Sequence, residues 1–183
     1  MILFVFAGKV SFAAPDDPTI TVSSPSGLPG QIVTVSISVD ADSNIRGGTL
    51  EMMYDLVFDA SFLTYVRCDN AAGFPIFIPT PGSGTVRILF ISSDPIVDET
   101  TLFTITFNIS PDATPGIIPL SLEVAPGGIT GPDGLIPVNI VNGSIKVLPT
   151  ILFGDINNDG EIDGADVTRL RRYIAGWNVV LGS

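Results

Sequence analysis

Hydrophobic and polar residues alternate along several segments in the first three quarters of the chain. In residues 31–39 valines and isoleucines alternate with threonine and serines, and in residues 101–109 phenylalanines and isoleucines alternate with threonines and an asparagine. A period of two residues is typical of a strand with one face in a core and the other in solvent. Less regular segments of the same kind are 49–54, 62–66, 85–92 and 117–124.

Clusters of glycine, proline and small polar residues separate these segments, as turns require. Because no stretch with helical periodicity lies between the strands, the pattern predicts a mainly β fold, an antiparallel sandwich or jelly roll, over residues 17–149. Asn142-Gly143 predicts a tight turn or bulge near its end, between residues 138–141 and 144–147. The turn clusters are 24–27, 79–84, 111–116, 126–128 and 131–134.

Residues 150–183 follow a different pattern, which begins with oxygen-bearing side chains at alternate positions. Calcium takes six to eight oxygen ligands, and a loop that surrounds it presents them at its positions one, three, five, seven, nine and twelve. Asp155, Asn157 and Asp159 fill the first three of these positions, and Gly160 stands where the loop must turn sharply.

The second half of the loop completes the predicted ligand set. Glu161 would contribute its backbone carbonyl, Asp163 would act directly or through water, and Asp166 would close the shell. An acidic solvated loop is the alternative. However, the four aspartates of this loop, crowded into twelve residues, repel one another unless a cation neutralises them. The spacing therefore favours Ca²⁺ as cofactor.

An amphipathic helix is predicted after the loop, so the fold is a β-sandwich followed by a small calcium loop-helix module. Val167, Leu170, Ile174 and Trp177 recur at helical spacing, three arginines lie around the other face, and a glycine stands near the end. The arginines are Arg169, Arg171 and Arg172.

The charge and residue inventory narrows the function classes. The chain of 183 residues carries a formal net charge of -11, which repels a phosphate backbone, so nucleic acid is a poor candidate partner. The absence of histidine and the single cysteine exclude His-based catalytic triads, His-ligated zinc and disulfides within the chain. Cys68 is expected to be a half-buried structural thiol or a site of intermolecular pairing.

The N-terminus points to an extracellular protein. Residues 1–14 contain a short apolar core, residues 2–7, and end in Ser11-Phe12-Ala13-Ala14, like the back half of a secretory signal with a small-x-small cleavage site. A buried first strand is the alternative. Although the mean hydropathy is +0.50, no apolar run reaches the roughly 20 residues of a spanning helix. We therefore expect a secreted or cell-surface protein without a membrane span.

The tail resembles one repeat of a dockerin. Residues 154–176 carry the pattern Gly-Asp-x-Asn-x-Asp-Gly-x-Ile-Asp-x-x-Asp, followed by a leucine and a basic pair. Dockerins end the loop in Asp, as Asp166 does here. The resemblance implies calcium binding and a recognition face that would include Gly164, Ala165, Arg171 and Arg172. A solvated helix end is the alternative for the arginines.

The preceding domain is similar to a cohesin, the β-sandwich that dockerins bind. The residues that carry this similarity are 30–35, 48–55, 102–107 and 136–144. The two resemblances together imply a secreted, non-catalytic assembly module of the kind found in cellulosomes, linked to extracellular polysaccharide degradation. The sandwich would bind a dockerin-bearing protein, and the tail would bind a cohesin-bearing one.

One departure from the dockerin pattern is the presence of a single repeat where that family carries two. A truncated gene product is expected, and a single-repeat module is the alternative. With no second repeat to cover it, the helix face formed by Val167, Leu170 and Trp177 should be partly exposed.

Two other function classes remain open at this stage. A carbohydrate-binding sandwich with a tethering tail would need exposed aromatic residues, for which the candidates are Tyr54, Tyr65, Phe74 and Phe77. A glycosidase would need two carboxylates across a cleft. Its candidates are Asp55, Asp59, Asp94, Asp98 and Glu99, but such loop residues are more typical of caps and turns, and we expect no enzyme.

Overall fold

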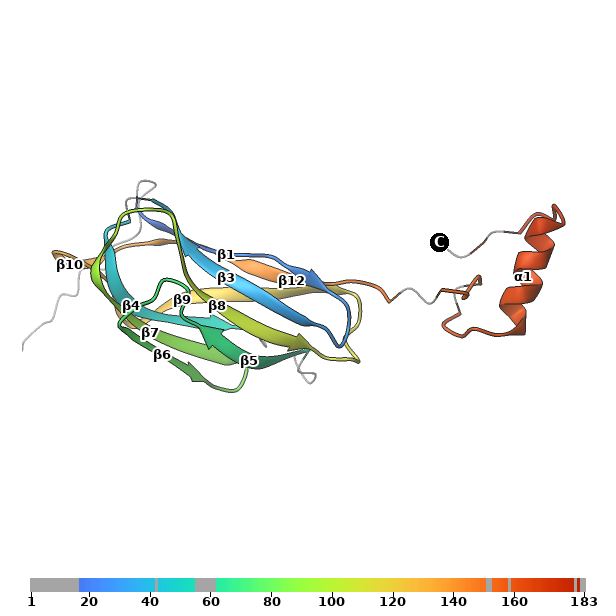
Figure 1. Cartoon of the computed structure of the whole chain (residues 1–183), viewed down its shortest axis with the longest axis horizontal. Helices are drawn as coiled ribbons and strands as arrows, with labels where there is room; N and C mark the ends of the chain where they lie inside the picture. Colours follow the sequence, from blue (N-terminus) through green and yellow to red (C-terminus); the bar gives the residue numbers. More distant parts are fainter. Residues whose placement is uncertain are drawn as a thin grey trace, which may run out of the picture. The chain divides into compact units, whose positions relative to one another are not determined.

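Two β-sheets stack face to face in the first part of the chain (Figure 1). The structure is a computed structural model that describes residues 17–41, 43–54, 62–150, 153–157, 159–179 and 181. It divides into two units, Met1–Leu148 and Pro149–Ser183, here called the sandwich and the tail. The expected signal segment, residues 1–14, lies outside the described residues.

The first sheet has five strands in the order β11-β1-β3-β8-β5, and all but one of its pairs are antiparallel. The exception is the parallel pair of β1 and β11. Its strands are β1 (Thr19–Val22), β3 (Ile32–Val39), β5 (Leu63–Asp69), β8 (Thr100–Ile109) and β11 (Asn139–Val141).

The second sheet has seven strands, six of them in the order β2-β12-β9-β4-β7-β6, with β10 paired to β9. Its strands are β2 (Ser26–Gly27), β4 (Ile45–Met53), β6 (Ile76–Pro81), β7 (Thr85–Ile96), β9 (Gly116–Gly131), β10 (Gly134–Ile136) and β12 (Gly143–Val147). Together the sheets form the predicted mainly β sandwich of cohesin-like jelly-roll type.

The core lies between the sheets, where alternate residues of the strands meet. Phe90 of β7 lies 6.3 Å from Phe103 of β8, measured between ring centroids, and both rings are fully buried. Such contacts across the two inner faces remove apolar surface from water, which is the main driving force of folding. The regular alternation predicted for residues 31–39 and 101–109 corresponds to β3 and β8, which pair with each other.

One predicted turn cluster, 126–128, lies inside a strand, and another, 79–84, does so in its first half, while residues 82–84 form the predicted turn between β6 and β7. Residues 79–81 belong to β6, an edge strand that bonds only to β7, so Pro79 and Pro81 can occupy it although they have no N–H to donate. Residues 126–128 lie within β9, where Gly127 and Gly128 adopt positive φ beside a shift of register against β4. These glycines form an irregularity in a continuing strand and not a turn.

Asn142-Gly143 marks the point at which the chain leaves one sheet for the other. β11 pairs with β1 in the first sheet, and β12 pairs with β9 in the second, so the two strands do not form a hairpin with each other. The Asn142 side-chain oxygen accepts a hydrogen bond from the Leu122 N–H at 2.9 Å. A Cβ on Gly143 would lie 2.5 Å from the Ser23 carbonyl oxygen, so only glycine fits there.

The tail contains one helix among its described residues, α1 (Gly164–Ile174). Asp163 caps its N-terminus by accepting a hydrogen bond from the Ala165 N–H at 2.7 Å. At the other end Gly176 has φ +76°, a conformation that favours glycine and ends the helix before Trp177. Among the described residues no helix is both long and apolar enough to cross a membrane.

Candidate functional site

The outer face of the seven-stranded sheet carries a group of exposed aliphatic side chains. Ile76 and Ile78 of β6 are 44% and 50% exposed, and Leu89 and Ile91 of β7 are 36% and 43% exposed. The register places Ile76 opposite Ile91 and Ile78 opposite Leu89, so the four side chains are neighbours on one face. We call these four residues the apolar patch.

The apolar patch exists because β7 is apolar on both of its faces. Val86, Ile88 and Phe90 alternate with the outward residues and are fully buried in the core. An antiparallel strand with one face in solvent normally shows polar residues on that face. The exposed isoleucines and leucine therefore indicate a surface that binds another molecule.

Charged residues border the apolar patch on the same sheet. Arg87 of β7 donates to Glu51 of β4 at 2.8 Å, and Glu123 of β9 stands opposite Glu51 in the register. Like charges placed opposite each other are unfavourable, and the Arg87 guanidinium offsets this for Glu51. The arrangement of an apolar centre with a charged margin is typical of protein–protein interfaces.

The outer face of the five-stranded sheet carries small hydroxyl side chains along the middle of β3 and β8. Thr34 lies 3.4 Å from Thr106 and Ser38 lies 3.2 Å from Thr101, measured between hydroxyl oxygens across β3 and β8. We call the following residues the hydroxyl face: Thr34, Ser36, Ser38, Thr101, Thr104 and Thr106.

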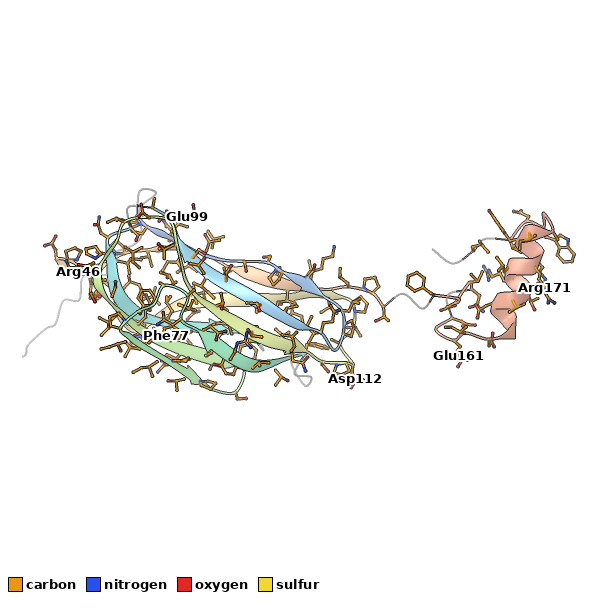
Figure 2. The ribbon with its side chains drawn as sticks, viewed as in Figure 1. Arg46, Phe77, Glu99, Asp112, Glu161 and Arg171 are labelled. Carbon is orange, nitrogen blue, oxygen red and sulfur yellow. The ribbon has the colours of Figure 1, made fainter. Side chains whose placement is uncertain are left out.

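Two of the aromatic residues considered for carbohydrate stacking face the core. Tyr54 and Phe74 are each 6% exposed and contact Phe107 and Phe90 at ring-centroid distances of 4.8 and 4.9 Å, so they cannot stack on a sugar. Phe77, labelled in Figure 2, lies 5.9 Å from Phe103, and both Phe77 and Tyr65 are partly buried against the core. Carbohydrate binding stays a prediction that now depends on these two rings.

The tail loop is organised by its own side chains. Asp155 accepts hydrogen bonds from the N–H groups of Asp159 at 3.2 Å and Gly160 at 2.9 Å. Asn157 accepts from the Asp159 N–H at 3.0 Å, and Asp159 accepts from the Glu161 N–H at 3.0 Å. Gly160 has φ +90°, so the sharp turn predicted at the sixth position of the loop is present.

Asp166 joins the two ends of this loop. Its carboxylate accepts hydrogen bonds from the N–H groups of Ile156, Asn157 and Asp163 at 2.6, 3.2 and 2.8 Å. Hydrogen bonds from backbone N–H groups, above all that from Asp163, hold the pKa of Asp166 below its usual value. Asp166 is only 2% exposed, and no other described residue of the tail is buried.

The predicted ligand set is thus brought into one loop, but it is not gathered around a common point. Among the described residues no group of three or more Asp, Glu, His or Cys side chains has the spacing of a metal site. Asp163 uses one carboxylate oxygen to cap the helix, while Glu161 is exposed on the loop (Figure 2). The calcium assignment therefore stays a prediction.

The helix residues expected to contact a partner lie on two sides of α1. Gly164, Ala165 and Arg172 line one groove, together with Asn157, Thr168, Arg169, Asn178 and Val179. Arg171, labelled in Figure 2, does not line this groove. Arg172 also packs over the ring of Trp177, with its guanidinium carbon 5.7 Å from the ring centroid.

Residues 18–147 match the family model of the cohesin domain. This chain belongs to the cohesin family. Cohesin is a non-catalytic interaction module. Three of the carboxylates considered for glycosidase catalysis, Asp94, Asp98 and Glu99, are exposed. An acid–base pair needs one carboxyl group that is sheltered from water, so these residues are consistent with a non-catalytic module. The other two candidate carboxylates, Asp55 and Asp59, lie outside the described residues.

Solved cohesin structures share the sandwich fold. The seventh ScaB type I cohesin from Pseudobacteroides cellulosolvens is 19% identical with a TM-score of 0.65, and the match covers 74% of this chain and 95% of that one. A non-cellulosomal cohesin from Archaeoglobus fulgidus is 16% identical with a TM-score of 0.61, over 73% and 92% of the chains. A type I cohesin–dockerin complex from Clostridium thermocellum contributes a match at 19% identity and a TM-score of 0.60, over 73% and 100%.

No curated protein matches the chain by sequence. The cohesin match ends at residue 147, so the tail lies outside it. The interpretation of the tail depends on its own residues.

Cys68 of this cohesin lies in β5 and packs against the core. Burial, with a smaller contribution from the nearby Asp69 carboxylate, raises the pKa of its thiol from 9.0 to about 12. The thiol is therefore protonated at neutral pH, which agrees with the half-buried structural role expected from the sequence.

Proposed function

We propose that the sandwich is a receptor for a dockerin-bearing protein and that it binds this partner through the apolar patch. Membership of the cohesin family supports the class of partner, since one similar structure is a cohesin–dockerin complex. The observation that carries the choice of surface is the alignment of four exposed aliphatic side chains on β6 and β7.

The apolar patch suits a partner that presents a hydrophobic helix or loop surface. Its side chains stand on paired strands, so they are held in position before the partner arrives and lose little freedom on binding. The Glu51–Arg87 pair at the margin is exposed and would contribute to orientation more than to affinity.

Calorimetry of the full chain against a panel of dockerins tests this proposal. In the variant Ile78→Asp, a carboxylate would be buried in the apolar interface, so we expect the affinity for the best dockerin to fall by about tenfold or more. Ile32→Asp is the matched control, because Ile32 is 66% exposed and lies on the outer side of the other sheet.

Equal losses in both variants, or no loss in Ile78→Asp, would show that the partner binds elsewhere. Absence of binding by any dockerin in the panel, together with heat from a soluble polysaccharide, would move the function to carbohydrate binding.

We further propose that the tail is a single dockerin-type repeat that binds Ca²⁺ and docks on a cohesin-bearing protein. The donor set fits this ion, because it consists only of oxygen atoms and the loop turns at Gly160. The ligands would come from Asp155, Asn157, Asp159, Asp163, Asp166 and the Glu161 carbonyl. Bound calcium would neutralise the carboxylates of this loop.

A titration followed by circular dichroism tests the calcium site. In the parent chain, calcium should increase the helical signal by ordering the loop that precedes α1. Asp155→Ala should abolish this increase, whereas Asp112→Ala, which removes an exposed carboxylate of the sandwich, should leave it unchanged. If the Asp155 variant responded like the parent chain, the ligand assignment would be refuted.

The cellular setting is part of the same proposal. We infer a secreted protein that assembles enzymes of polysaccharide degradation, and the signal-like residues 1–14 support secretion. The cohesin from Archaeoglobus fulgidus is described as non-cellulosomal, so the family alone leaves the polysaccharide open. Fractionation of the native host, with detection of the chain outside the cell, tests the location.

A further inference from the structure

The tail exposes nearly all of its large apolar side chains. Trp177 is 62% exposed, Ile174 is 74% exposed and Val167 is 49% exposed. No apolar side chain among the described tail residues is buried. The expectation that this helix face is uncovered is therefore confirmed for the described residues, and the tail has no hydrophobic core of its own.

Three of these side chains form a stripe along α1. Val167, Leu170 and Ile174 lie three and four residues apart, which places them on one side of the helix. The groove lined by Ala165 and Arg172 lies on the other side, and Trp177, which follows the turn at Gly176, packs against Arg172. We call Val167, Leu170 and Ile174 the helix stripe.

Charge is divided between the two ends of the tail. The carboxylates of the loop stand beside the N-terminal end of α1, where Asp163 caps the helix. Arg171 and Arg172 stand in its last turn. The helix of 11 residues is about 16 Å long, so these two charged regions are well separated but still flank the same stripe.

Such a surface is complementary to a second copy of itself. When two helices pack antiparallel around a two-fold axis, the last turn of one lies beside the first turn of the other. Arg171 of each copy, four residues after Val167 and so beside the helix stripe, would then face the acidic loop of its partner, and the two helix stripes would cover each other. A parallel arrangement would bring arginines against arginines and carboxylates against carboxylates.

We propose that two copies of the chain associate through their tails, as an antiparallel pair of α1 helices closed by the helix stripe. The lack of a buried apolar side chain among the described tail residues supports an oligomeric solution, because a unit without a core of its own needs a metal or association to be stable. The dimer presents two cohesin sandwiches, so that a partner with two dockerins gains affinity through the linkage of its two sites.

Sedimentation equilibrium of the full chain in millimolar calcium, over a wide range of concentration, tests this proposal. The parent chain should show a reversible monomer–dimer equilibrium. The double variant Leu170→Ser/Ile174→Ser removes apolar contact area from the helix stripe, and we expect its dimer dissociation constant to rise by about tenfold or more. The matched control is Ile117→Ser, which removes a side chain of the sandwich that is 71% exposed.

A second variant tests the antiparallel arrangement through charge. Arg171→Glu/Arg172→Glu should weaken the dimer, and its dissociation constant should lose the salt dependence of the parent chain. All of these side chains are exposed, so the substitutions leave the folded sandwich intact, which circular dichroism can verify.

Any one of three results would overturn the tail dimer. They are a parent chain that is monomeric at every concentration, a dimer that survives both tail variants, and a dimer that is lost in Ile78→Asp and Ile117→Ser instead. The last result would assign the association to the sandwich. Dockerin binding by the monomeric tail variants is measured separately, so failure of the dimer and failure of the receptor function are distinguished.

Discussion

The two outer faces of the sandwich obey the same alternation of side chains and yet have opposite characters. On the five-stranded sheet the outward positions of β3 and β8, apart from the terminal pair Ile32 and Asn108, are threonines and serines, some of which contact each other across the strands. On the seven-stranded sheet the outward positions of β6 and β7 hold the apolar patch. Both faces cover a core of the same kind.

The difference between the two outer faces indicates which one has a sequence determined by function and not by folding alone. The hydroxyl face is what folding alone requires, since it keeps one side of a sheet solvated and satisfies polar groups locally. The apolar patch adds nothing to the core and leaves aliphatic area in water. A surface of this kind is explained by a partner, and we assign it to the dockerin-bearing protein of the proposed function.

The backbone beneath the two faces differs as well. β4 crosses the middle of the seven-stranded sheet with Gly47 and Gly48 in succession, and its register shifts against both β7 and β9 near these glycines. A Cβ on Gly48 would press on the Ile129 side chain and lie 2.9 Å from the Gly128 carbonyl oxygen. The sheet that carries the apolar patch therefore depends on close approach of its central strands.

Gly48→Val should have the largest effect on stability. The new side chain must displace β9 backbone, and overpacking of this kind typically costs about 1–3 kcal/mol, here at the upper end because backbone opposes the Cβ. Denaturant unfolding measures the loss. Gly116→Ala is the control, since a Cβ there meets only one atom, at 4.0 Å. Equal stability of the two variants would show that the sheet yields easily at Gly48.

Sequence patterns predicted the two regular strands of the five-stranded sheet, β3 and β8. The strict alternation of hydrophobic and polar residues predicted both strands, the orientation of their side chains and the polar nature of their outer face. The edge strand β6 was missed because Pro79 and Pro81 are typical of turns, and only the topology shows that β6 lies at the edge of the sheet, where proline is tolerated.

The apolar patch could not be predicted, because it depends on register. Ile76 and Ile91 are fifteen positions apart in the chain and become neighbours only through the pairing of β6 with β7. A pattern of apolar residues on both faces of residues 85–92 was the available signal, but by itself it is equally typical of a fully buried strand. In the tail, by contrast, the spacing of oxygen-bearing residues predicted the turn at Gly160 directly.

The hydroxyl face should respond weakly to substitution. Thr34→Val, Thr106→Val and the double variant form a thermodynamic cycle whose coupling energy we expect to be about 0.5 kcal/mol, as for other cross-strand pairs. Denaturant unfolding of the four proteins gives this value, and calorimetry should show an unchanged affinity for a dockerin. A loss of dockerin affinity in these variants would show that the partner binds the hydroxyl face and not the apolar patch.

The thiol of Cys68 gives the smallest effect, because its ionisation changes the free energy of unfolding only at alkaline pH and not at neutral pH. The folded chain keeps the thiol protonated up to a pKa of about 12, whereas the unfolded chain loses this proton near the usual value of 9.0. Above pH 9 the unfolded state therefore binds fewer protons, and the free energy of unfolding must fall as the pH rises. Cys68→Ala removes this dependence, although the lost packing lowers its stability at every pH. The two unfolding free energies should thus converge between pH 9 and pH 11, and curves that stay parallel would show that the thiol ionises as freely in the folded sandwich as in the unfolded chain.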